Sequence, residues 1–316
     1  MIKYTVQRLF ALLLTLWVIL TIAFLVIRLM PGSIYEDTDL PPRLLETMEA
    51  RYQLNEPMIV QYWYFVQNIA RGDWGTSIAI RVSVPVWEVL YSRIPVSLLL
   101  NLLSLFISLP IGILAGILAA LFQNRRTDHA ISFAVVLFVS VPSFVFATLL
   151  QYTLAFRFGW FPIVYSTSPG GTPYWWSMIL PITALALGPI ARVTRYLRGE
   201  LIETISSDFM LLARTKGLTV FQATVRHAMR NSLLPLANII IPMFTSILTG
   251  SLVIERIFAI GGVGGLLVNS LNANDHPLTV AILVFYSLVS LLTILVVDLS
   301  YGLIDPRVRV GGSKNE

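Results

Sequence analysis

The chain has no cysteine, few charged residues and only three histidines. Asp, Glu, Lys and Arg make up 12% of its 316 residues, far below the roughly 25% of an ordinary soluble domain. The absence of cysteine excludes disulfides, thiolate metal sites and cysteine nucleophiles. The histidines are scattered at His129, His227 and His276, a spacing that does not predict a metal centre.

Motifs that mark catalytic chemistry are also absent from the sequence. It contains no Gly-x-x-x-x-Gly-Lys-Ser/Thr loop to cradle phosphates and no His-Glu-x-x-His zinc motif. It also lacks the serine-centred elbow of hydrolases. We therefore expect no enzyme in this chain, no cofactor-binding site and no catalytic residue. Any energy input must come from a partner or from an ion gradient.

Long apolar runs are what the chain has in abundance. It is 56% hydrophobic, with a mean hydropathy of +0.77, and one spanning helix needs about 20 apolar residues. The sequence therefore predicts an all-α integral membrane protein with six transmembrane helices. The expected spans are Leu9 to Ile27, Val96 to Phe122, Ala130 to Phe156, Trp175 to Ala191, Leu234 to Ile254 and Leu278 to Val297.

The distribution of lysine and arginine predicts the orientation, because cytoplasmic loops are enriched in both. Placing both termini in the cytoplasm puts most of the 22 basic residues inside. The sequence pI of about 9.6 then reflects topology, and no nucleic-acid partner is needed. The inner set comprises Lys3, Arg8, Arg125, Arg126, Arg192, Arg195, Arg198, Arg214, Lys216, Arg226, Arg230, Arg307, Arg309 and Lys314.

This topology divides the chain into four parts. Residues 1–30 form an N-terminal transmembrane helix, and residues 31–93 form an extracytoplasmic region. The transmembrane core spans 94–303, and residues 304–316 are a cytoplasmic tail. Amphipathic stretches at 44–52 and 58–71 within the outer region predict either a helical cap at the membrane interface or a docking rim for an extracytoplasmic protein.

The longest polar island on the cytoplasmic side runs from Arg192 to Pro235. We predict a helix over Glu200–Lys216, a left-handed cap at Gly217 and a second helix from Thr219. The apolar face of the second helix would rest on the spans, and the tip between the two helices would project into the cytosol. The island is either a docking site for a soluble partner or a solvated loop that only satisfies the positive-inside rule. That apolar face comprises Phe221, Val225, Ala228, Met229 and Ser232.

Polar and helix-breaking residues within the spans are candidates for a translocation path. Asn101, Pro142, Ser143 and Gln151 are candidate pore-lining residues, although each could instead serve its neighbouring backbone. Asp298 near the end of the last span is either a proton site or the structural partner of an arginine. Proline also occurs within the spans at positions 110, 181, 189 and 242, and Gly112 with Gly116 predicts close helix packing.

Several motifs resemble a known family across nearly the whole chain. The polar island resembles the EAA loop of ABC-importer permeases, in the version found in B-type subunits of oligopeptide and dipeptide importers. The Glu-Ala-Ala that names the loop is replaced by Leu211-Leu212-Ala213 in this chain. The matching motifs are Ala213-Arg214-x-Lys216-Gly217-Leu218, Arg226-His227-Ala228-x-Arg230-Asn231-x-Leu233-Leu234-Pro235, Arg71–Ser77, Val139–Phe144, Phe258-x-x-Gly261-Gly262-Val263-Gly264 and Asp298–Arg307.

The resemblance implies a type I ABC-importer permease fold in a bacterial or archaeal plasma or inner membrane. The chain would form half of a translocation pore with a second, homologous permease chain. Two cytoplasmic ATPases would carry ATP and Mg, and an extracytoplasmic solute-binding protein would deliver peptide. The implied ATPase-coupling loop consists of Ala213, Arg214, Thr215, Lys216, Gly217, Leu218 and Thr219.

Alternatives to peptide import remain open from the sequence. Relatives of this family handle nickel chelates, glutathione, opines or antimicrobial peptides with the same machinery. A more distant alternative is a proton-coupled secondary transporter that uses Asp298, but the sequence shows no inverted internal repeats of the kind common in such transporters. A purely structural membrane subunit would give the basic island no purpose.

Overall fold

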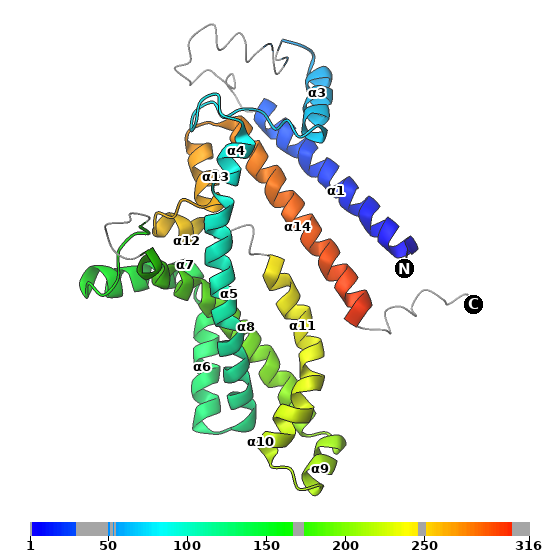
Figure 1. Ribbon diagram of the computed structural model, residues 1–316, viewed down its shortest axis with the longest axis vertical. Coiled ribbons are helices and arrows are strands. Elements are labelled where there is room, and N and C mark those ends of the chain that lie inside the picture. The colour runs from blue at the N-terminus through cyan, green and yellow to red at the C-terminus, as the bar shows by residue number, and fades with distance from the viewer. Residues whose placement is uncertain are drawn as a thin grey trace. The chain divides into compact units, whose positions relative to one another are not determined.

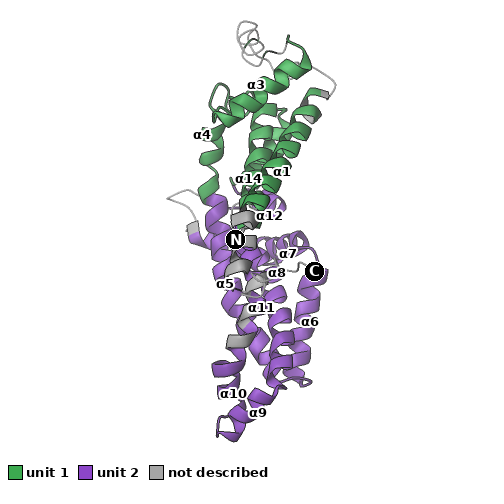
Figure 2. Cartoon of the chain, turned by 90° about the vertical axis from the view of Figure 1, so that its right-hand side faces the viewer, with its two compact units in different colours: residues 1–95, 261–295 green, residues 96–260, 296–316 purple. Residues whose placement is uncertain are grey.

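The computed structural model describes residues 2–29, 50, 53, 55–166, 174–245 and 251–304. These described residues are helical or irregular, and their one β feature is an isolated antiparallel bridge between Thr76 and Pro85. The chain divides into two compact units, residues 1–95 with 261–295 and residues 96–260 with 296–316 (Figure 2). The fold is therefore all-α, as predicted.

Unit 1 is built on two long apolar helices, α1 (Ile2–Leu29) and α14 (His276–Ile304), which run alongside each other (Figure 1). Leu20 of α1 packs with Val280 and Val284 of α14. The amphipathic stretch at 58–71 forms α3 (Met58–Ala70), as predicted, and Phe65 and Ile69 pack against this core. Two short helices, α4 (Val86–Tyr91) and α13 (Val263–Asn272), complete the unit.

Unit 2 is organised around α8 (Tyr174–Ile205), the longest helix of the chain. Leucines and alanines of α8 belong to two separate apolar cores, one toward each end of the helix. The other elements are α5 (Ile94–Leu121), α6 (Arg126–Ser140), α7 (Ser143–Leu150), π-helix η1 (Gln151–Arg157), α9 (Asp208–Thr215), α10 (Val220–Ala223), π-helix η2 (Thr224–Ala228), α11 (Met229–Thr245) and α12 (Leu252–Ile257).

Two glycines bring α5 close to α8, which confirms the predicted small-residue packing. A Cβ added at Gly112 would lie 2.8 Å from Val193 Cβ, and one at Gly116 would lie 3.0 Å from Leu197 Cβ. The close approach also lets Thr194 Oγ1 donate a hydrogen bond to the carbonyl of Gly112 at 3.1 Å. Only glycine leaves room for this contact.

The predicted third span is broken at Pro142. Val141 is extended (φ −95°, ψ 126°), because the ring of a following proline disfavours the helical conformation. Helix α6 ends at Ser140, and the pair of helices that follows is bent by 101° from it. The span predicted over Ala130–Phe156 therefore consists of helices on either side of a break at Pro142, one of the helix-breaking residues noted in the sequence. By contrast, Pro110 lies inside α5, and Pro181 and Pro189 lie inside α8.

Four helices of the described residues are long and apolar enough to cross a membrane, or five if the bent pair counts as one span. They match the first, second, fourth and sixth predicted spans. The helix at the second predicted span begins earlier, at Val86, and the helix at the fourth predicted span ends later, at Ile205. The fifth predicted span, Leu234 to Ile254, lies partly outside the described residues, and so do residues 31–49 and the tail from 305. The count of six spans and the location of both termini stay predictions.

Candidate functional site

The middle of the polar island, from Asp208 to Ala223, folds into a helical hairpin of α9 and α10. Helix α9 ends where Gly217 adopts φ +92°, the left-handed conformation predicted for its cap. Thr219 then caps α10: its side chain accepts from the Gln222 backbone N–H at 3.2 Å, and the Gln222 side chain accepts from the Thr219 N–H at 3.1 Å. This reciprocal capping box fixes the start of the second helix.

The first helix of the island is divided, contrary to expectation. In place of one helix over Glu200–Lys216, α8 ends at Ile205 and α9 begins at Asp208. Ser206 and Ser207 separate them, and each donates its hydroxyl to a carbonyl three residues earlier. Such local serine hydrogen bonds compete with helix continuation.

Buried apolar side chains, most of them alanines, attach the hairpin to the rest of unit 2. Met210 and Ala213 of α9, Ala223 of α10 and Ala228 of η2 are buried in one core with Leu201 of α8. The hairpin and η2 therefore share one continuous apolar core with α8.

The apolar face predicted for the second helix packs in its later part only. Ala228 and Ser232 are buried and Met229 packs against the same core, whereas Phe221 and Val225 are 61% and 48% exposed. Ala223 and Thr224, which the prediction did not include, are fully buried, because close helix contact favours small side chains. Other apolar side chains exposed on α9 and α10 are Phe209, Leu211, Leu212 and Val220.

The predicted coupling-loop residues lie together at the turn of the hairpin (Figure 1). Ala213 is buried, and Leu218 is half-buried. Arg214, Thr215, Lys216, Gly217 and Thr219 are exposed. The hairpin thus presents two cationic side chains beside exposed apolar ones, a combination suited to a protein surface with acidic and apolar groups.

A buried ion pair that the sequence did not reveal joins α6 to α8. Asp128 is 2% exposed and accepts hydrogen bonds from Arg198 Nε at 2.6 Å and Nη2 at 2.8 Å. It also accepts from the Asn124 backbone N–H at 2.9 Å. The i, i+70 separation gives no local pattern that would identify the pair.

The predicted pore-lining residues fall into two groups. Pro142 and Ser143 line a cavity of about 820 Å³ between the α6–α7 bend and α8. Asn101 instead donates to the carbonyl of Ser97 at 2.7 Å, and Gln151 Nε2 lies 2.8 Å from the carbonyls of Ile163 and Ile257. Asn101 thus bonds to the backbone of its own helix and Gln151 to two more distant backbone carbonyls, and the place of either side chain in a pore stays a prediction.

A second buried carboxylate, Asp275, organises the 77–80 segment of unit 1. Its side chain is fully buried and accepts from Ser77 Oγ and from the backbone N–H groups of Ala79 at 3.1 Å and Ile80 at 3.0 Å. The carboxylate predicted as a candidate site from the sequence was Asp298, whose side chain lies outside the described residues. Within the described part of the chain, no group of three or more His, Asp or Glu side chains could hold a metal ion.

Solved structures of importer subunits share this fold. The MetNI methionine ABC transporter, in inward-facing conformations, contains a chain that aligns with a TM-score of 0.57 at 16% identity, covering 71% of this chain and 99% of that chain. A bacterial ABC transporter involved in import of the acidic polysaccharide alginate aligns with a TM-score of 0.55 at 14% identity, over 82% and 98%. At these identities the likeness concerns the fold alone.

Closer relatives match from end to end. The dipeptide transport system permease protein DppB of Lactococcus lactis subsp. cremoris is 40% identical over 98% of this chain and 100% of its own length. The DppB protein of Bacillus subtilis is 37% identical over 98% and 99%. The oligopeptide transport system permease protein OppB of Haemophilus influenzae is 36% identical over 98% and 100%.

Two family models cover most of the sequence. The N-terminal model of binding-protein-dependent transport system membrane components matches residues 1–101. The model described as "binding-protein-dependent transport system inner membrane component" matches residues 112–310, which include α8 and the α9–α10 hairpin. Together with the full-length relatives, these matches show that the chain belongs to the family of inner membrane components of binding-protein-dependent transport systems.

Proposed function

We propose that this chain is one of two homologous permease chains that form the pore of an ATP-driven importer of peptides. The observation that carries the proposal is the 36–40% identity, over 98% of the chain, to permease proteins named for dipeptide and oligopeptide transport. Relatives of this length and identity share their whole architecture with the chain. The cavity beside α8, which is lined by charged and aromatic side chains, is a surface on which a peptide could bind during transport.

Energy enters from two cytoplasmic ATPases that hold ATP and Mg, while this chain contributes no nucleotide site. The α9–α10 hairpin is the proposed contact, through Arg214, Lys216 and the exposed apolar side chains Leu211 and Phe221. Exposed apolar groups beside cations are what a partly desolvated protein interface needs. In this proposal, residues 213–219 are the loop that couples the ATPases to the transmembrane helices.

Coupling follows from the packing of the hairpin. Its buried side chains are continuous with the core along α8, and the Asp128–Arg198 pair joins α8 to α6. Movement of the ATPases would therefore tilt α6, α8 and the hairpin together, as a rigid-body switch. An extracytoplasmic binding protein would deliver the cargo at the outer face, and both termini would lie in the cytoplasm of a bacterial or archaeal cell.

The experiment measures ATP hydrolysis and peptide uptake in the reconstituted complex of both permeases, the ATPases and the binding protein. Gly217→Val should abolish stimulated hydrolysis and uptake together, because a β-branched residue is strained at φ +92° and the turn must change shape. No atom lies within 4 Å of a Cβ at Gly217, so the effect would come from the backbone alone. Charge reversal in Arg214→Glu or Lys216→Glu should weaken the ATPase contact.

Gly159→Val is the matched control. Gly159 also has a positive φ (+65°) and open space around its Cβ, but it follows η1, far along the chain from the hairpin. It should retain coupling at comparable expression. Full coupling in Gly217→Val would contradict the assigned role of the hairpin. Uptake of nickel chelates or glutathione, with no uptake of peptides, would contradict the proposed cargo.

A further inference from the structure

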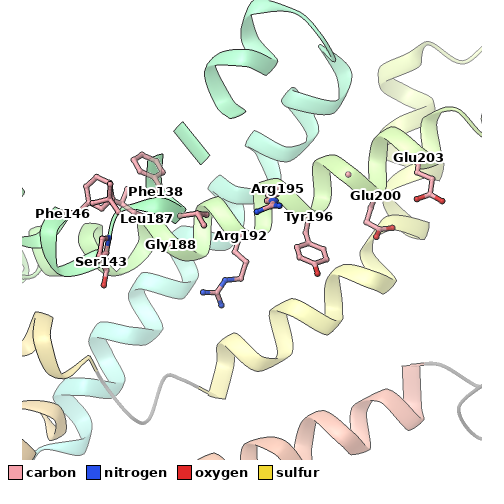
Figure 3. A pocket seen from close by; sticks show the side chains of 14 residues that line it. Phe138, Ser143, Phe146, Leu187, Gly188, Arg192, Arg195, Tyr196, Glu200 and Glu203 are labelled. Atoms are coloured by element: carbon pink, nitrogen blue, oxygen red, sulfur yellow. The ribbon is translucent and has the colours of Figure 1, made fainter. Parts of the chain in front are cut away.

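The cavity beside α8 joins two predicted pore-lining residues, Pro142 and Ser143, to charged residues of α8 to which the sequence gave no role in the pore. One wall is the break between α6 and α7, with the rings of Phe138 and Phe146 and the Ser143 side chain. The other wall is a single stripe of α8, and Arg192, Tyr196 and Glu200 project from it to the same side (Figure 3). The members of this α8 stripe are Leu187, Gly188, Arg192, Arg195, Tyr196, Gly199, Glu200 and Glu203.

Charge is sorted along the α8 stripe. Both arginines, Arg192 and Arg195, lie toward the α6–α7 bend, and both glutamates, Glu200 and Glu203, lie toward the hairpin. The closest opposite charges, Arg195 and Glu200, are five positions apart and therefore miss the three- and four-residue spacings that pair side chains on a helix. No ion pair within the described part of the chain involves these four residues.

A third arginine of α8, Arg198, differs from Arg192 and Arg195 because it has an acidic partner. Arg198 is not part of the stripe and pairs instead with the buried Asp128 of α6. Arg192 and Arg195 are exposed and face the cavity instead. Their charge therefore remains available to a ligand, as does that of the glutamates.

We propose that the α8 stripe binds a short peptide as a zwitterion during translocation. Arg192 and Arg195 hold its terminal carboxylate, and Glu200 and Glu203 hold its terminal ammonium group. Arginine binds carboxylates through two parallel hydrogen bonds, and carboxylates accept from an ammonium group. The inference deepens the proposed function, on which it rests, by assigning the recognition of peptide termini to this chain.

The dimensions of the site agree with a peptide of roughly two to five residues. At 1.5 Å per residue, Arg195 and Glu200 are about 7.5 Å apart along the helix axis, and Arg192 and Glu203 are about 16.5 Å apart. An extended peptide spans at most about 3.3–3.6 Å per residue. The cavity volume of about 820 Å³ also lies within the range of roughly 300–1,000 Å³ typical of small-molecule sites.

The recognition would depend on the termini and not on the sequence of the peptide. Phe138, Phe146 and Tyr196 supply apolar surface without a shaped pocket for one side chain. Gly188 and Gly199 leave open space, since no atom lies within 4 Å of a Cβ at either. A site of this kind would accept many peptides, provided that both ends are charged.

The test uses a single-cysteine variant and follows labelling of this chain alone, which has no cysteine of its own. Tyr196→Cys places a thiol within the stripe, and Gln123→Cys, exposed in the α5–α6 connection, is the control. The assembled importer in lipid nanodiscs is treated with N-ethylmaleimide, with and without trialanine. At about ten times its Kd, trialanine should slow labelling of Tyr196→Cys roughly tenfold by mass action and leave Gln123→Cys unaffected.

The charges are then removed in turn, first from the termini of the peptide and then from the side chains of the stripe. N-acetyl-trialanine amide, which has neither terminal charge, should not protect. Arg192→Gln in the Tyr196→Cys background should raise the concentration of trialanine needed for protection about tenfold, the effect of a charge-assisted hydrogen bond. Glu200→Gln should do the same for trialanine but not for N-acetyl-trialanine.

The other results overturn the inference. Equal protection by trialanine and its uncharged derivative would show an apolar cavity that ignores the termini. No protection, or a cysteine that cannot be labelled because the second permease covers the stripe, would show that peptides do not bind there. If the same complexes still take up peptide with ATP, the proposed function stands without this site. Absence of peptide uptake in the wild-type complex would contradict the proposed function itself.

Discussion

The Asp128–Arg198 ion pair makes a quantitative prediction about the stability of unit 2. Replacing Arg198 with methionine retains an apolar stem and removes both hydrogen bonds to Asp128, of 2.6 and 2.8 Å. The carboxylate, 2% exposed, would keep the Asn124 N–H and a long 3.3 Å contact with Ser132 Oγ. An uncompensated buried charge is therefore the main consequence of the substitution.

The expected loss is about 3 kcal/mol in the free energy of unfolding. Breaking a buried pair by removing one partner costs roughly 3–5 kcal/mol. The Arg198 side chain is 30% exposed, so water replaces part of the lost interaction, and the lower end of that range applies. Asp128→Asn should lower the free energy of unfolding by about 2 kcal/mol, because the amide has one acceptor oxygen and no charge to pair with Arg198.

The two substitutions should not be additive. In the double variant, Asp128→Asn with Arg198→Met, no charge is left buried, so we expect a coupling energy of about 2 kcal/mol. Denaturant unfolding of the assembled complex in bicelles measures all four states of the cycle. Arg195→Met is the matched control on the same helix, because Arg195 is exposed and makes no ion pair among the described residues.

Two results would refute this reasoning. Additive effects of Asp128→Asn and Arg198→Met would show that the two side chains do not interact in the folded protein. A loss in Arg198→Met no larger than that in Arg195→Met would show that the contact with Asp128 is worth no more than a solvent-exposed charge.

Further predictions concern packing, the outer segment, topology and assembly. Gly112→Val should destabilise the chain by about 1–3 kcal/mol, because even a Cβ there is 2.8 Å from a side chain of α8; unchanged thermal stability would contradict the close packing. Asp275→Ala should expose the segment around Ala79 to faster tryptic cleavage than Asp275→Asn does, because three donors lose their acceptor; equal cleavage rates would argue against the carboxylate as anchor. A reporter after Arg126 or Glu316 should read as cytoplasmic and one within 36–56 as outside, and an outside signal at Glu316 would refute six spans. The chain expressed alone should give poor yield that recovers with its second permease; a stable, transport-active homodimer would contradict the half-pore.

Several features of this structure follow from local sequence alone, without any tertiary contact. The apolar runs predicted the membrane helices, because length and hydropathy alone decide whether a helix can span a bilayer. The turn at Gly217 followed from its conformational freedom, and the bend at Pro142 from the restriction that proline places on the preceding residue. The break at Ser206 and Ser207 also has a local cause, which the helical prediction over Glu200–Lys216 overlooked.

Tertiary contact decided which faces pack and which charges are buried. On the apolar face predicted for the second hairpin helix, Ala228 is buried in the core shared with α8 and Phe221 is exposed, a difference that the periodicity does not contain. The Asp128–Arg198 pair depends on two helices 70 residues apart in sequence. The cavity likewise arises where the α6–α7 bend meets α8. Sequence periodicity describes one helix at a time, whereas burial and ion pairing depend on the distance between helices.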